Sequence, residues 1–128
     1  GQVTTIGLVL GGGSRHETVP GVSHVLELLA FGSSESYTDI SAQVLELGGS
    51  SFCSSGREQS IYSLDVLRPN LTKAMPMLAD ALLHPLLGEA EIEQTKRIIE
   101  FQWMDVMPEV RLNEGLQMAA YGPLDGVV

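Results

Sequence analysis

A mostly apolar run near the start of the chain, and two runs of alternating apolar and polar residues in its middle, predict β-strands. Val3 to Leu10 is rich in β-branched and aliphatic residues and closes on glycines, as a buried strand entering a loop does. The two alternating runs, Ser50 to Ser55 and Gln59 to Leu67, predict a hairpin whose turn contains Gly56 and Arg57.

Between and after these runs, apolar residues recur at the spacing of amphipathic helices. The spacing predicts helices over Gly21 to Phe31 and over Ser36 to Gly48, each ending near a glycine. A third helix is expected from a cap at Asn70 to about His84, with Pro76 bending it or marking an early turn.

The longest helical pattern runs from Glu89 to about Met107, and glutamates in its first turn suit the helix dipole. Pro108 ends it, and a last helix is expected from about Glu109 to Tyr121. This order of elements predicts the α+β class, with an antiparallel-leaning sheet and helices packed on one side.

Composition indicates ordered protein of about one domain. The chain has 128 residues and is 44% hydrophobic, enough to form a core. The start lacks the features of a signal peptide and the end, "LDGVV", carries no stop signal, so we expect residues 1–128 to be a single partial domain truncated at both ends. No run approaches the ~18 apolar residues of a transmembrane helix.

The net charge of -9, from 7 basic and 16 acidic residues, disfavours nucleic acid as a partner and favours a basic one. Cys53 is the only cysteine, which excludes an internal disulfide and a cysteine-rich zinc site. A reducing compartment fits this composition best.

One predicted helix carries part of a metal-binding motif. In "SHVLELLAF", residues 23–31, a histidine in place of Leu28 would complete H-x-x-E-H, in which two histidines grip zinc and the glutamate activates water. Leucine offers no lone pair, so His24 and Glu27 are left without the third protein ligand of a catalytic zinc. Taken alone, such a histidine is typical of a hydrogen-bonded core or interface residue.

Three blocks around this helix resemble the amino-terminal domain of the inverted-motif zinc peptidases, in the same order and at similar spacing. They are "GGGSRHET" with "GVSHVLELLAF", then "LELGGSSFCSSGREQSIYSLDVL", then "LADALLHPLLGEAEIEQTKRIIEF". That family includes both subunits of the mitochondrial processing peptidase, the core proteins of respiratory complex III and insulin-degrading enzymes. The resemblance covers nearly the whole chain and implies a partial amino-terminal domain of this kind.

The resemblance also implies a degenerate zinc site. It places the family's first zinc histidine on His24, its general-base glutamate on Glu27 and its second zinc histidine on Leu28. Matching "LGEAEIE" without gaps places the supporting glutamate on Thr95 and the third zinc ligand on Gln102. Leucine cannot coordinate zinc and a neutral amide coordinates it weakly, so no catalytic set is intact and no metal or other cofactor is expected here.

A shifted register would bring Glu100 or Asp105 to the third position instead, without repairing Leu28. An active zinc peptidase therefore stays possible only if a ligand comes from elsewhere in the chain or from a partner.

Loss of the zinc site is typical of the family's non-catalytic members, and "GVSHVLELLAF" and "HPLLGEAEIE" look most like the alpha-type subunit of the processing peptidase. The resemblance then implies a mitochondrial chain, in the matrix or on the matrix side of the inner membrane. Its partners would be a zinc-bearing catalytic beta subunit and basic, amphipathic presequence peptides. The alternative is a structural core subunit with other complex III subunits as partners.

Two further groups of residues are candidates for contacts rather than chemistry. Arg57 and Glu58, at a strand entrance, would either pair locally or contact an extended peptide added to the sheet edge. Trp103, Met104 and Met107 indicate core or subunit contacts and not a cofactor site.

Overall fold

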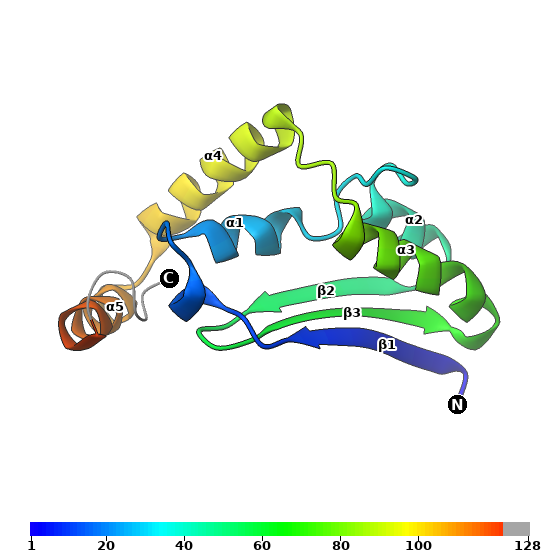
Figure 1. Ribbon diagram of the computed structural model, residues 1–128, viewed down its shortest axis with the longest axis horizontal. Coiled ribbons are helices and arrows are strands. Elements are labelled where there is room, and N and C mark those ends of the chain that lie inside the picture. The colour runs from blue at the N-terminus through cyan, green and yellow to red at the C-terminus, as the bar shows by residue number, and fades with distance from the viewer. Residues whose placement is uncertain (122–128) are drawn as a thin grey trace.

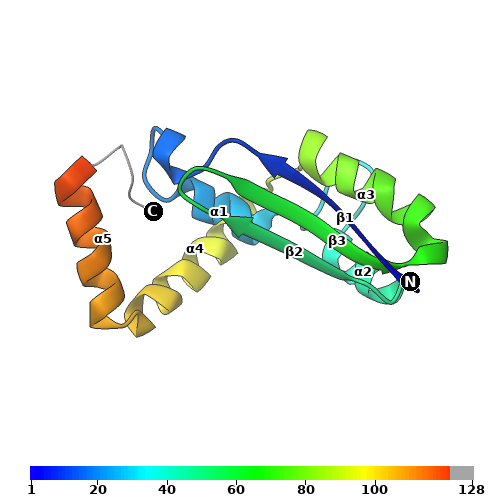
Figure 2. The ribbon, with the colours of Figure 1, turned by 90° about the horizontal axis from the view of Figure 1, so that it is seen from below.

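The computed structural model describes residues 1–121, in which three strands form one antiparallel sheet (Figure 1). The strands are β1 (Val3–Leu10), β2 (Ser50–Ser55) and β3 (Ser60–Leu67). β3 lies in the middle and runs antiparallel to both neighbours (Figure 2). The structure confirms the predicted α+β class and antiparallel sheet. The "LDGVV" end lies outside the described residues.

Three helices cover one face of this sheet, and two more extend past its end (Figure 1). The covering helices are α1 (Val22–Leu29), α2 (Ile40–Glu46) and α3 (Leu71–Leu83). The others are α4 (Glu89–Asp105), which packs against α1, and α5 (Pro108–Tyr121). Short 3₁₀ turns, η1 (Ser14–His16) and η2 (Arg68–Asn70), precede α1 and α3. Within residues 1–121 no helix has the length and apolarity to cross a membrane.

The core lies between β3 and the helices α2 and α3. Leu64 and Val66 on β3 are fully buried, as is Val44 on α2. In the register of the sheet Leu64 stands between Ile6 of β1 and Ser51 of β2, so both neighbouring strands shield it from the side. Burial of such aliphatic side chains is the main term that holds this small sheet to its helices.

The Asp80 carboxylate of α3 binds the segment that precedes α2, and this segment is not helical. Oδ2 of Asp80 accepts hydrogen bonds from the Ser34 hydroxyl, at 2.5 Å, and from the Ser36 backbone N–H, at 3.0 Å. Asp39, in the left-handed region with φ 44°, then caps α2 by accepting from the Ala42 N–H. The predicted helix from Ser36 was therefore too long, because α2 begins at Ile40.

Removal of the Asp80 carboxylate should weaken the fold in a pH-dependent way. Hydrogen bonds from Ser34 and Ser36 lower the pKa of Asp80 below its ordinary value. A carboxylate with a depressed folded-state pKa stabilises the fold above about pH 4, and the stabilisation is lost as the pH falls through the folded-state pKa. We expect Asp80→Asn to lower the melting temperature at about pH 7 and by clearly less at about pH 3. Equal losses at both pH values in thermal melts would contradict this.

α3 begins directly after Asn70, as predicted, but the capping role of the Asn70 side chain and the early turn considered at Pro76 are not found. Asn70 does not cap the helix with its side chain, because its Nδ2 donates to the Leu47 carbonyl at 2.9 Å and so ties the end of α2 to the start of α3. Pro76 marks no early turn, since α3 continues unbroken through it. Pro76 has no N–H to donate to the carbonyl of Thr72, four residues earlier. Thr72 is exposed, so water can take the place of that donor.

Candidate functional site

A carboxylate that precedes α1 fixes the start of this helix. Oε1 of Glu17 accepts from the Gly21 N–H at 2.7 Å, and Oε2 accepts from the Ser23 N–H at 2.9 Å. These are N–H groups that the first helical turn leaves without partners. Gly21 adopts φ 89°, which suits glycine. The sequence contained the signal, a glutamate just before the helix, but its capping role was not predicted.

Packing of α1 against α4 brings together residues far apart in the sequence. Nε2 of His24 lies 3.2 Å from Oε1 of Gln102, and its Nδ1 lies 3.8 Å from Oε2 of Glu27. Glu27 in turn accepts a hydrogen bond from the Ser55 N–H of β2 at 3.1 Å. The ungapped match along α4 placed Gln102 beside the H-x-x-E pair, and the structure has the two side chains in contact.

The remaining candidate positions add no metal donor to this group. Leu28 lies on α1, one turn after His24, and Thr95 is buried on α4. The group therefore offers an imidazole, a carboxylate and a neutral amide, with the amide oxygen already bonded to the imidazole. Catalytic zinc takes three protein ligands from nitrogen, sulfur and carboxylate donors, so these residues do not fit it. Within residues 1–121, no three His, Cys, Asp or Glu side chains are placed to share a metal ion.

Cys53 of β2 and Tyr62 of β3 lie directly opposite each other in the sheet, near Glu27. Burial and, as a smaller contribution, the negative charge of Glu27 raise the pKa of the Cys53 thiol to about 11, against a hydrogen bond with Tyr62 that lowers it. Burial also raises the pKa of Tyr62. The thiol is therefore neutral near pH 7 and is not suited to act as a nucleophile.

We expect Cys53 to react slowly with iodoacetamide. With a pKa of about 11 instead of 9.0, its thiolate fraction at pH 8 falls by about 100-fold, and the alkylation rate should fall with it. Glu27→Gln removes the negative charge that raises the pKa of Cys53 and should speed the reaction, whereas the distant Glu109→Gln should not. Mass spectrometry of the alkylated chain over time provides the rates, and an ordinary thiol rate at pH 8 would contradict the burial of this group.

The β2–β3 hairpin turn is fastened to neighbouring segments on both sides. The Ser14 and Arg15 N–H groups donate to the Gly56 and Arg57 carbonyls, at 3.1 and 2.9 Å. Gly13 allows this approach, because a Cβ there would lie 2.2 Å from the Gly56 oxygen.

The side chains of the turn form ion pairs within the chain. Arg57 Nη2 lies 2.7 Å from Glu114 Oε1 of α5, and Glu58 lies 2.9 Å from Arg15. Arg57 and Glu58 thus pair with side chains distant in the sequence, and not locally as one alternative had it. Contact with an added peptide stays a prediction. The Arg57–Glu114 pair, across 57 residues, had no signal in the sequence.

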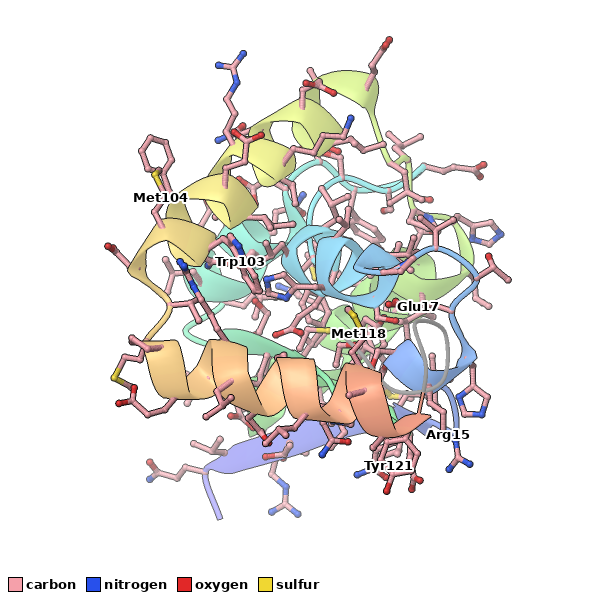
Figure 3. The ribbon with its side chains drawn as sticks, turned by 90° about the vertical axis from the view of Figure 1, so that its left-hand side faces the viewer. Arg15, Glu17, Trp103, Met104, Met118 and Tyr121 are labelled. Atoms are coloured by element: carbon pink, nitrogen blue, oxygen red, sulfur yellow. The ribbon has the colours of Figure 1, made fainter. Side chains whose placement is uncertain are left out.

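A groove of about 990 Å³ lies between α1, α4 and α5, with Val25, Ile99 and Val110 among its apolar walls. Figure 3 looks onto it: Trp103 and Met118 lie in the space framed by these helices, while Met104 lies on the other side of α4. Trp103, Met104 and Met107 are 52%, 65% and 64% exposed, so the expectation that they form core was wrong. Contact with another subunit stays a prediction for them.

Comparison with known proteins places this arrangement in a family. The family model described as "Insulinase (Peptidase family M16)" matches residues 1–124. A crystal structure of a protease from Helicobacter pylori matches 79% of the chain and 26% of its own length, with a TM-score of 0.71 and 25% identity.

Curated relatives share about a third of their residues with the chain. The alpha subunit of the mitochondrial-processing peptidase of Bos taurus is 34% identical over 130 residues, covering 94% of this chain. The beta subunit of Homo sapiens is 32% identical over 86% of the chain, and the zinc protease YmxG of Bacillus subtilis is 31% identical over 91%. The chain spans about a quarter of the length of these relatives, between 23% and 30%. On the family match and the fold together, the chain belongs to the insulinase family of peptidases, peptidase family M16.

Proposed function

We propose that the protein is a non-catalytic, presequence-recognising subunit of a heterodimeric mitochondrial processing peptidase, acting in the mitochondrial matrix. The observation that carries the proposal is the contact between His24 and Gln102, with Leu28 one turn along α1. Two of the three positions that the family resemblance assigns to zinc ligands hold residues unsuited to zinc, although the scaffold around them is kept.

Several features support the alpha-type role over a catalytic one. The relatives include both alpha and beta subunits of the processing peptidase, and the alpha subunits match more of this chain, 94% against 86%. Glu27, the position that the family resemblance assigns to the general base, accepts a hydrogen bond from the Ser55 N–H and lies 3.8 Å from the His24 imidazole. Zinc and the cleavage chemistry would then belong to the beta-type partner, and the acidic chain would help to hold the basic presequence.

Cleavage of a presequence peptide by a beta-type partner, with and without this protein, tests the proposal. We expect cleavage to depend on the added protein and to be unchanged by its Glu27→Gln variant, since Glu27 has no metal-bound water to activate. A large loss with Glu27→Gln would show that this chain carries the chemistry. Cleavage that is indifferent to the added protein would refute the recognition role.

A further inference from the structure

The groove between α1, α4 and α5 combines apolar walls with acidic groups. Its walls include Leu26, Leu29 and Ile92, and two glutamates, Glu100 and Glu114, also line it. Lys96 lines it too, but its ammonium pairs with Glu93 at 2.6 Å. The groove thus presents apolar surface with carboxylates beside it, at the upper end of the roughly 300–1,000 Å³ range of ligand pockets.

One carboxylate oxygen of Glu114 has no hydrogen-bond donor among the described residues. Its Oε1 pairs with Arg57, whereas its Oε2 is buried and has no hydrogen-bond partner in the described part of the chain. A buried carboxylate oxygen without a donor is unfavourable, and such atoms are few in folded proteins. A ligand that brings an N–H donor or a positive charge to Oε2 would remove this penalty.

We propose that the groove binds an amphipathic peptide helix through its apolar face, with an arginine or lysine of the peptide meeting Glu114 Oε2. Helices commonly bind in apolar grooves in this way. Charge complementarity favours a basic peptide, since the chain carries a net charge of -9, Glu100 lines the groove, and Glu114, although paired with Arg57 through Oε1, leaves Oε2 without a donor. Trp103 and Met118 supply broad apolar contact at the groove.

The inference deepens the proposed function, on which it rests for the ligand being a peptide, and it locates that peptide on this chain. The site is built by α4 and α5 as much as by the degenerate helix α1. It requires no metal and no reaction.

Binding of a fluorescent model peptide of about three helical turns, with leucines along one face and one arginine beside them, tests the proposal by anisotropy. The full chain and its Glu114→Gln variant are compared. Glutamine can still accept from Arg57, so α5 stays attached while the charge is lost. We expect binding to weaken about tenfold, whereas Glu109→Gln on the same helix should leave it unchanged. Leu26→Ala, which trims the apolar wall, should also weaken binding.

A change on the peptide separates charge from folding effects. When citrulline replaces the arginine, binding to the unmodified chain should weaken about as much as with Glu114→Gln, and that variant should add no further loss. A benzophenone on the leucine face should crosslink to Met118 and not to Met75. Equal binding by the Glu114 and Glu109 variants, or crosslinks away from the groove, would overturn the proposal. So would a dimer of the chain that excludes the peptide.

The outcome is distinguishable from that of the cleavage assay. If the protein promotes cleavage but Glu114→Gln has no effect on peptide binding, the groove assignment fails while the proposed function stands. If binding depends on Glu114 but cleavage does not depend on the protein, the groove stands and the processing role fails.

Discussion

Leu64→Ala should lower the free energy of unfolding by about 3 kcal/mol. Leu64 is fully buried at the centre of the middle strand, between Ile6 and Ser51 in the register and under the helices. Truncation leaves a cavity that the surrounding strands cannot close, because β3 is hydrogen-bonded on both sides. Urea denaturation followed by circular dichroism measures the loss as a shift of the midpoint.

The matched control is Leu8→Ala, on the same face of the edge strand β1. Leu8 is 42% exposed, so its truncation removes less buried surface and should lower the stability by about 1 kcal/mol or less. Similar losses for Leu8 and Leu64 would mean that the core is not centred on β3.

The strands were predictable because their signals are local. Val3–Leu10 and Ser50–Ser55 were predicted with the bounds that the structure has, and β3 begins one residue later than expected, at Ser60. Alternation and the glycines that follow or join these runs fix such bounds within a few residues. The order of the strands in the sheet depends on long-range pairing and was not predicted.

The start of α2 was harder to predict because a distant group decides it. Nothing near Ser36 in the sequence shows that Asp80, 44 residues away, binds its N–H. The start of α3 directly after Asn70 was predicted correctly, but the Asn70 side chain donates to the Leu47 carbonyl and does not cap the helix. In both cases a tertiary hydrogen bond prevailed over a local preference, which single-sequence patterns do not contain.

Part of the candidate site was predicted from the sequence, and part of it depends on contacts between distant segments. The family resemblance assigned His24 and Gln102 to the same site, and the packing of α1 against α4 places their side chains in contact. The groove was missed because its walls come from α1, α4 and α5, and because Glu114, which lines it, is held by Arg57 of a distant hairpin. No spacing within one segment of sequence contains that information.

Restoration of the two missing donors should give the chain a zinc site. His24 and Gln102 are already in contact, and position 28 shares the face of α1 that holds His24. The double variant Leu28→His with Gln102→Glu therefore supplies two imidazoles and a carboxylate, the set of a catalytic zinc site. We expect stoichiometric zinc, bound about 100-fold or more tightly than by the unmodified chain. Titration against a chromogenic chelator measures it.

The single variant Leu28→His and a triple variant identify which residues of α1 and α4 hold the zinc. Leu28→His alone should bind zinc weakly, because the neutral amide of Gln102 remains. If it binds as tightly as the double variant, a native carboxylate such as Glu100 or Asp105 supplies the third donor, and the shifted register along α4 is correct. Addition of His24→Ala to the double variant should abolish the site. Zinc that survives this change would be bound elsewhere on the acidic surface, and the contact between α1 and α4 would not be the family's metal position.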